Sequence, residues 1–263
     1  GFAQTFRPSM EALPKGQMRT VPALAATLDH LASVGLDDFY RGDVGRELAA
    51  DAERLGLAVT RSDLEAYRAR MVEALSLKLP GVTVMNFPPP TQGLTSLMIL
   101  GLFEALGVSK AESFDHHHGL VEATKRALMV RNRVITDPAH MTADISRYLT
   151  EAWFAKEAAK IDRKKAAPFP LPDEDGDTIW MGAIDGSGLA VSYIQSIYWE
   201  YGSGCVMPKT GVLWQNRGIA FSLDEKAVNP LTPGRKPFHT LNPAMALFDD
   251  GRVVSYGTMG GDG

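Results

Sequence analysis

The stretch Asp175-Gly176-Asp177-Thr178-Ile179-Trp180-Met181-Gly182-Ala183-Ile184-Asp185 joins an acidic loop to an apolar segment that begins with a threonine. Before this stretch, apolar residues mostly recur at the spacing of three to four that an amphipathic helix requires. After it, short apolar runs are separated by Gly, Pro and Asp, which is typical of strands joined by turns. A helical part followed by consecutive strands predicts the α+β class with antiparallel sheets rather than βαβ alternation.

Capping patterns and apolar spacing predict the helices. Residues 20–24 read Thr-Val-Pro-Ala-Leu, and proline suits the first turn of a helix. Ser62 and Glu65 match a capping box, which predicts a helix that begins after Ser62 and runs through about Leu77. Residues 91–106 are expected to form another helix.

Strands are expected where short apolar runs meet turn residues. Val82–Phe87 is predicted to be a strand that the prolines at 88–90 end, because proline lacks the N–H that a ladder requires. Asp185–Gly188 is predicted to be the turn of a hairpin. The strands expected after the acidic loop cover residues 178–184, 189–197, 211–216, 244–248 and 253–256.

Neither the histidines nor the cysteine of the chain predict a metal site. His116-His117-His118 are successive residues of an expected helix, so their side chains point about 100° apart and cannot converge on one ion. Asp115 is interpreted as the N-cap of that helix. Cys205 is the single cysteine, which excludes an intrachain disulfide and a Cys-rich zinc site, and it is expected to be a packed strand residue. We expect no metal and no cofactor.

Composition excludes several classes of protein. The 263 residues are 45% hydrophobic and 22% charged, as in globular proteins, and the net charge of −4 argues against nucleic acid or an anionic membrane as partner. No apolar run approaches the about 18 residues of a membrane span. Residues 1–5 lack an initiating Met and a basic region, so we expect an excerpt of a longer protein. We expect a cytoplasmic location, with a periplasmic location as the alternative.

Thr178 has a chemical significance if the bond before it is cut. Its hydroxyl then serves as a nucleophile and its own α-amine, which titrates at roughly pH 7.7 to 8.0, serves as the base. One residue would supply both groups, without a histidine partner. The alternative interpretation from this stretch alone is a threonine at the edge of a strand.

Several short motifs together carry a resemblance to a known family. In chain order they are Pro22–Leu28, Phe39–Gly42, Asp63–Tyr67, Pro88–Gly93, Val121–Lys125 and Asp137-Pro138. With these motifs the chain resembles the γ-glutamyltransferase family of N-terminal-nucleophile hydrolases. The resemblance implies an αββα sandwich with stacked antiparallel sheets between helical layers. It also implies that residues 1–177 are the C-terminal part of a large subunit and that residues 178–263 are the N-terminal part of a small subunit, together one fold.

The resemblance assigns catalytic roles to four positions. The bond between Asp177 and Thr178 falls on the site of autocatalytic cleavage, and Thr178 falls on the nucleophile. Ser196 falls where the family commonly has a second threonine whose hydroxyl supports the nucleophile's amine; otherwise it is an ordinary strand serine. Gly260 and Gly261 fall on the glycine pair whose N–H groups stabilise the oxyanion; otherwise they form a turn.

The substrate-binding positions depart from the γ-glutamyl pattern. Tyr198 stands where transferases commonly have Asn, and Ala220 stands where they have an Asp that pairs with the substrate's ammonium. His239 and Thr240 replace a serine pair, and His239 adds a donor that can be cationic; its alternative role is that of a supporting histidine. These departures predict a short amide bearing a carboxylate, as in the oxamate amidohydrolase branch. Arg217 and His239 are the candidates for the substrate carboxylate.

Three functions follow as hypotheses. The first is a self-processing amidohydrolase that acts on a small amide such as oxamate. The second is a γ-glutamyl or other acyl transferase or hydrolase, of the glutathione type or acting on β-lactam side chains. The third is an unprocessed binding protein. The resemblance also implies that the chain's own second subunit is a partner after cleavage, with a homodimer of heterodimers as the expected assembly.

Overall fold

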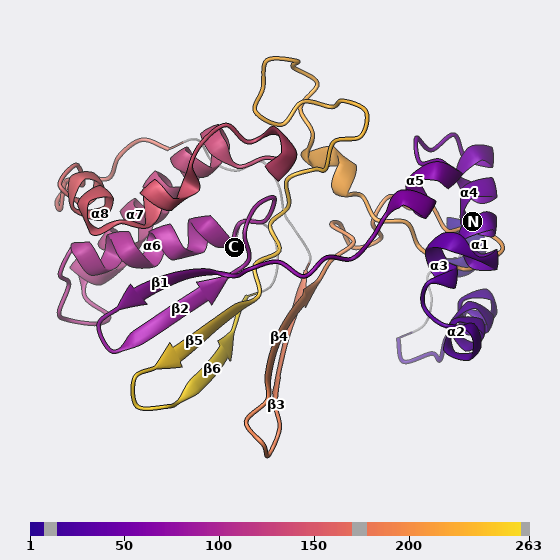
Figure 1. Cartoon of the computed structure of the whole chain (residues 1–263), viewed down its shortest axis with the longest axis horizontal. Coiled ribbons are helices and arrows are strands. Elements are labelled where there is room, and N and C mark those ends of the chain that lie inside the picture. The colour runs from indigo at the N-terminus through magenta and orange to yellow at the C-terminus, as the bar shows by residue number, and fades with distance from the viewer. Residues whose placement is uncertain (8–14, 170–177, 259–263) are drawn as a thin grey trace. The chain divides into compact units, whose positions relative to one another are not determined.

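The chain forms two compact units. The computed structural model describes residues 1–7, 15–169 and 178–258, so that Asp177, Gly260 and Gly261 lie outside the described residues. The first unit comprises Gly1–Met71 and Ile197–Asn216, and the second comprises Val72–Ser196 and Arg217–Gly263 (Figure 1). The second unit contains residues from both sides of the expected cleavage site.

The first unit is helical. Its helices are α1 (Phe2–Phe6), α2 (Pro22–Val34), α3 (Asp38–Arg41), α4 (Asp43–Arg54) and α5 (Arg61–Ala66). A buried cluster holds α2, α4 and α5 to the loop segment 197–216, and it consists of Leu31, Val44, Leu48, Leu64 and Met207. The Thr27 hydroxyl of α2 donates to the Thr210 carbonyl at 2.8 Å, which ties the same loop to the helices.

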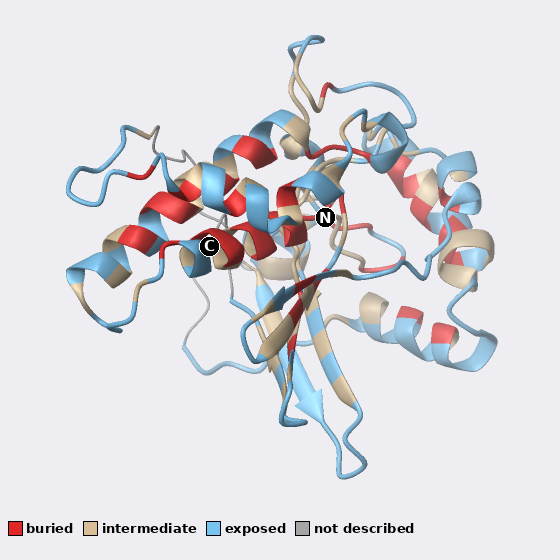
Figure 2. Cartoon of the chain, turned by 60° about the vertical axis from the view of Figure 1, so that its left-hand side comes forward, coloured by how far each residue is buried: buried red, intermediate tan, exposed pale blue. Residues whose placement is uncertain are grey.

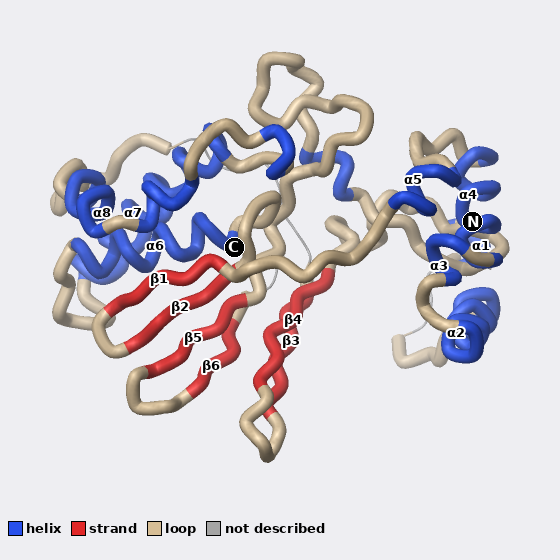
Figure 3. Tube along the Cα trace, viewed as in Figure 1, coloured by secondary structure: helices blue, strands red, loops and turns tan. Residues whose placement is uncertain are grey.

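The second unit has α+β architecture. Its main sheet is antiparallel and has the order β1 (Leu75–Leu79), β2 (Val82–Asn86), β5 (Ala244–Phe248) and β6 (Val253–Tyr256). Helix α6 (Gly93–Ala105) packs on this sheet, and α7 (Phe114–Val134) and α8 (Glu151–Ala158) pack against α6 (Figure 3). Three short 3₁₀ helices, η1 (Pro138–His140), η2 (Ile145–Leu149) and η3 (Arg217–Ala220), connect these elements.

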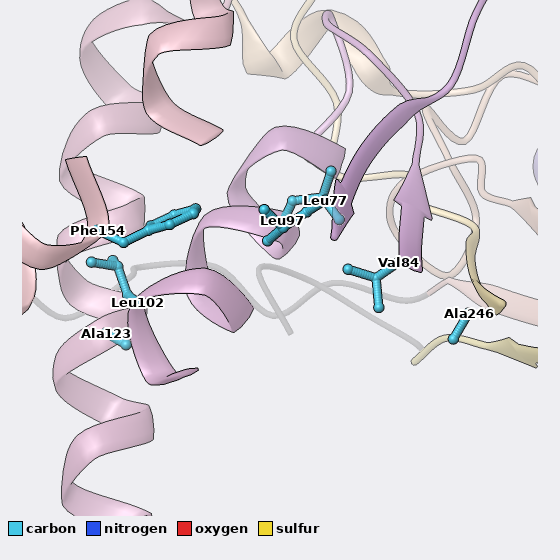
Figure 4. Packing of buried hydrophobic residues seen from close by; sticks show 7 residues of the cluster. All are labelled: Leu77, Val84, Leu97, Leu102, Ala123, Phe154 and Ala246. Atoms are coloured by element: carbon cyan, nitrogen blue, oxygen red, sulfur yellow. The ribbon is translucent and has the colours of Figure 1, made fainter. Parts of the chain in front are cut away.

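The sheet buries one face against α6 because its apolar residues alternate. Leu77 lies opposite Val84, and Val84 lies opposite Ala246, so the three side chains form a row across three strands. Leu97 and Leu102 of α6, which are fully buried, pack in the same cluster as this row (Figure 4). Alternation with period two is what directs a strand's apolar residues to one face.

We expect Gly101→Ala to destabilise this core. A Cβ at Gly101 would lie 2.2 Å from Cζ of Phe154, whose ring is only 5% exposed. Such overpacking typically costs about 1 to 3 kcal/mol, against the about 1 kcal/mol that alanine contributes in a helix. The urea midpoint of unfolding should fall. Gly186→Ala is the control, since a Cβ there meets nothing within 4 Å, and an equal shift for both variants would contradict the prediction.

A second, two-stranded antiparallel sheet follows the acidic loop. Strands β3 (Ile179–Ile184) and β4 (Ala190–Gln195) pair from Ile179 opposite Gln195 to Ile184 opposite Ala190. The Asp185 carboxylate accepts hydrogen bonds from the backbone N–H groups of Ser187 and Leu189, which closes the turn. Much of this hairpin is exposed (Figure 2).

Several elements confirm the sequence predictions. Helix α2 begins at Pro22, β2 ends before the prolines, and α6 covers most of residues 91–106. The predicted strands at 178–184, 189–197, 244–248 and 253–256 correspond to β3, β4, β5 and β6, and the predicted hairpin turn joins β3 to β4. The predicted α+β class with antiparallel sheets is confirmed.

The helix predicted from Ser62 through about Leu77 is wrong at both ends. Thr60 is the N-cap of α5, since its hydroxyl accepts from Asp63 N–H and the Asp63 carboxylate accepts from Thr60 N–H at 2.8 Å. The helix ends at Ala66, and Leu77 lies in β1. Met71, in the segment between them, is 99% exposed, so this segment has no apolar packing to hold a helix, although its residues are good helix formers.

Three further predictions fail for local reasons. The N-cap of α7 is Ser113, whose hydroxyl accepts from His116 N–H at 3.2 Å, and Asp115 lies in the first turn instead. Residues 211–216 form a loop with one isolated bridge, between Val206 and Leu213, rather than a strand. Cys205, expected to be a packed strand residue, is instead a partly buried loop residue beside that bridge.

The described ranges contain no helix that combines the length and the apolar character needed to span a bilayer. They also contain no group of three His, Cys, Asp or Glu side chains arranged to hold a metal ion. The rings of the histidine triplet make aromatic contacts: His116 lies edge-on to Phe103 and to His117, and His118 stacks on Phe114.

Candidate active site

Thr178 and Ser196 meet at the open end of the β3–β4 hairpin. Thr178 precedes β3 and Ser196 follows β4, and they continue the register in which Ile179 lies opposite Gln195. The Thr178 hydroxyl donates to the Ser196 hydroxyl oxygen at 3.1 Å, and both residues are partly buried. The hairpin therefore brings together two side chains that are 18 positions apart.

A threonine hydroxyl held in this way is suited to nucleophilic chemistry. The contact orients Thr178 Oγ1 and places a second polar group at hydrogen-bond distance from it. The same threonine would supply its α-amine as base once the preceding bond is cut. The structure thus brings together two of the four predicted catalytic positions, while the cleaved residue and the glycine pair lie outside the described ranges.

Arg217 and His239 form a second cluster in the same unit. Arg217 is the first residue of η3, and its positive charge acts on the His239 ring. The His239 backbone N–H donates to the Pro90 carbonyl at 3.1 Å, and His239 also forms an isolated parallel bridge with Thr91. The proline run that ends β2 therefore provides the carbonyl that anchors the His239 backbone.

His239 is neutral at physiological pH, which corrects the expectation of a cationic donor. Burial, and to a smaller extent the positive charge of Arg217, lower its pKa from the ordinary 6.5 to about 4. Its Nδ1 atom is buried without a hydrogen-bond partner among the described residues. A neutral imidazole still offers one N–H donor to a ligand.

The titration of His239 can be measured directly. We expect its ring proton signals in NMR to shift with a midpoint near the pKa of about 4, and His239→Gln identifies the signal by removing it. Since the unfolded chain takes up this proton near 6.5, the stabilising effect of the neutral ring is complete above that pH and is lost as the pH falls toward 4. A midpoint near 6.5 would contradict this assignment.

Ala220 lines a small cavity that has no acidic wall. The cavity has a volume of about 210 Å³, and its described lining residues are Arg131, Asn132, Ile135, Ala220, Ser222, Ala227, Val228, Asn229 and Phe238. None of these side chains carries a negative charge. A substrate ammonium would find no carboxylate partner among them, whereas the nearby Arg131 guanidinium favours an anion.

The remaining predicted substrate positions are distributed over both units. Thr240 follows His239 in the second unit, and its carbonyl accepts from the Asn242 side-chain amide at 3.2 Å. Tyr198 lies in the first unit and has a φ of 80°, which is uncommon for a residue other than glycine. Such backbone conformations cluster at functional sites.

Sequence reasoning missed a buried group that lies against the Phe238 ring. Arg131 of α7 is 9% exposed, donates to the Gln92 side-chain carbonyl, and has its guanidinium 5.3 Å from the centre of the Phe238 ring. The sequence feature that could have indicated its burial is an arginine close to the apolar positions of a helix. This signal does not reveal which loop the arginine meets.

Comparisons with known proteins relate the whole chain to one family. A model of the gamma-glutamyltranspeptidase family matches residues 1–263. The chain is 50% identical over 263 residues to the oxamate amidohydrolase proenzyme of Klebsiella pneumoniae subsp. pneumoniae, which covers 100% of this chain and 50% of that protein. It is 38% identical over 242 residues to the glutathione hydrolase-like YwrD proenzyme of Bacillus subtilis, covering 91% of this chain and 46% of that protein.

A solved structure shows the same fold. The crystal structure of cephalosporin acylase from Bacillus halodurans matches with a TM-score of 0.89 and 31% identity, over 97% of this chain and 47% of the acylase chain. The α+β sandwich predicted from the sequence is confirmed by this match. The chain spans about half the length of the curated relatives it matches.

Proposed function

Because the chain belongs to the gamma-glutamyltranspeptidase family, we propose that it is part of a self-processing amidohydrolase. This enzyme acts on a small amide bearing a carboxylate, such as oxamate. The observation that carries the proposal is the hydrogen bond between the hydroxyls of Thr178 and Ser196. The relatives named as proenzymes support the self-processing part of the proposal.

The first reaction is cleavage of the chain. The Thr178 hydroxyl attacks the carbonyl carbon of Asp177, and the peptide nitrogen of Thr178 leaves and takes up a proton. The product is an ester between Asp177 and Thr178 Oγ1. Water opens this ester, which gives a free Asp177 carboxylate and restores the Thr178 hydroxyl beside the α-amine that the first step released. Ser196 holds the hydroxyl in position for the attack.

The second reaction is amide hydrolysis. The Thr178 α-amine takes the proton of its own hydroxyl as the oxygen attacks the substrate carbonyl. The backbone N–H groups of Gly260 and Gly261 stabilise the resulting oxyanion. The amine returns the proton to the leaving ammonia, and an acyl ester forms on Thr178. Water then attacks this ester and releases the free acid.

The substrate class rests on the second cluster. Arg217 binds the substrate carboxylate with its planar guanidinium, and the neutral His239 adds a hydrogen-bond donor. The cavity against Ala220 lacks a carboxylate for a γ-glutamyl ammonium. The name of the Klebsiella relative, at 50% identity, supports oxamate as the first substrate to test.

A paired assay tests this proposal. The natural full-length protein is given oxamate, with ammonia release as the readout, and in parallel a γ-glutamyl anilide and a cephalosporin with an acyl side chain. We expect oxamate to have the largest kcat/KM. A large preference for the glutamyl anilide or the cephalosporin would overturn the substrate assignment. Ligand binding without release of ammonia or of any other product would support the binding-protein hypothesis instead.

A further inference from the structure

We infer that Thr136 and Asp137, which follow helix α7, are positioning residues that set substrate affinity by holding segment 217–240 in place. The inference rests on the proposed function, because that segment contains Arg217, Ala220, His239 and Thr240. Both residues are buried, with 3% and 5% exposed surface, and both direct their side chains to this segment rather than to Thr178 or Ser196.

Asp137 fixes the backbone segment that precedes His239. One carboxylate oxygen accepts from the Lys236 backbone N–H at 2.8 Å, and the other accepts from the Ala139 N–H at 3.1 Å. Pro237 follows Lys236, and its ring restricts the backbone between the anchored Lys236 and His239. Since the His239 N–H is bound to the Pro90 carbonyl, this short stretch is held at both ends. The position of the imidazole therefore depends on the Asp137 carboxylate.

Thr136 holds the stretch that carries Ala220. Its hydroxyl donates to the Asn229 side-chain oxygen at 3.1 Å, and the Asn229 amide nitrogen donates to the Ala220 carbonyl at 2.9 Å. The Ala220 carbonyl can only accept, which determines the orientation of the Asn229 amide. A relay of two hydrogen bonds thus connects Thr136 to the wall of the cavity beside Ala220.

Arg235 braces the two contacts. Its guanidinium donates to the Thr136 hydroxyl at 2.8 Å and to the Val228 carbonyl at 2.7 Å. The Thr136 hydroxyl therefore acts at once as donor and acceptor, a role that valine cannot perform and serine can. In this way the residues that follow α7 secure the segment at Lys236, at Arg235 and, through Asn229, at Ala220.

The consequence is a separation of binding from chemistry. Cleavage before Thr178 is intramolecular and needs no substrate pocket, whereas capture of a free amide depends on Arg217 and His239. Loosening segment 217–240 should therefore raise KM while leaving chain cleavage intact. A general loss of folding would reduce both.

The test uses matched variants of the full-length protein. In Asp137→Asn the amide keeps the size of the carboxylate but can accept only one of the two backbone N–H bonds. Thr136→Val removes the hydroxyl at nearly constant volume, and Thr136→Ser restores it. Asp144→Asn is the control, because Asp144 makes a similar cap, to Ser146 N–H at 3.0 Å, before η2 and away from the segment.

We expect Asp137→Asn and Thr136→Val each to raise KM for oxamate by about tenfold or more, the effect of losing one buried hydrogen bond of ordinary strength. The kcat per processed active site should change by less than about threefold, and cleavage before Thr178 should be complete. Thr136→Ser and Asp144→Asn should keep the wild-type KM.

Unchanged KM in processed Asp137→Asn and Thr136→Val would overturn the inference. A loss of activity that a smaller fraction of folded protein explains entirely would also overturn it, since that is the result of a structural role alone. If Asp137→Asn does not fold, the pair Thr136→Val and Thr136→Ser decides the question. Failure of the wild-type protein itself to cleave or to release ammonia is a different result, because it overturns the proposed function and this inference with it.

Discussion

Replacing Thr178 by alanine is expected to abolish both cleavage of the chain and turnover of the amide substrate. The variant lacks the only oxygen that can form the two esters, and loss of a nucleophile commonly lowers the rate more than about a thousandfold. On a denaturing gel the variant should run as one chain, whereas the wild-type protein should give two fragments whose masses place the break before residue 178.

Thr178→Ser is the matched control, since it keeps the hydroxyl and the α-amine but removes the methyl group. It should retain part of both reactions. Two fragments of the same masses from Thr178→Ala would contradict the assignment of the nucleophile. Intact Thr178→Ser that is otherwise well folded would show that the methyl group, which restricts rotation of the threonine side chain, is needed for attack.

Replacing Arg217 by methionine is expected to raise KM for oxamate by about 10- to 100-fold, since a hydrogen bond to a charged group contributes roughly 1.5 to 3 kcal/mol. Cleavage before Thr178 should be unaffected. The same change should raise the pKa of His239, because the Arg217 charge is one of the two causes that lower it. Steady-state kinetics and the NMR titration of His239 measure the two effects independently.

Arg217→Lys is the control for charge without the planar guanidinium, and it should fall between the wild-type protein and Arg217→Met. If Arg217→Met raises the pKa of His239 but leaves KM unchanged, Arg217 does not bind the substrate carboxylate. If neither quantity changes, the proximity of the two side chains is also contradicted.

Sequence reasoning located most elements of the second unit but not all of the helix ends. The prolines at 88–90 end β2 whatever the tertiary structure around the strand, because the missing N–H is a property of the prolines themselves. Residues 67–77 have high helix propensity, yet they are not helical, because Met71 has no apolar packing and Leu77 pairs with Val84 in the sheet. Propensity gives way when a competing partner comes from elsewhere in the chain.

The candidate site also has one part that the sequence indicated and one part that it did not. The family resemblance assigned roles to Thr178 and Ser196, and the hairpin that joins them requires only alternation and a turn at Asp185–Gly188. The neutral state of His239 was not predicted. It arises from burial and from the charge of Arg217, and neither can be inferred from the residues next to His239.

The sequence by itself determined the hairpin and its turn, because strand alternation and turn chemistry act between residues close together in the chain. Only the tertiary structure decided which backbone groups hold His239, which residues after α7 secure segment 217–240, and whether the imidazole is charged. Those properties depend on burial and on electric fields, which are sums over atoms that folding alone brings together.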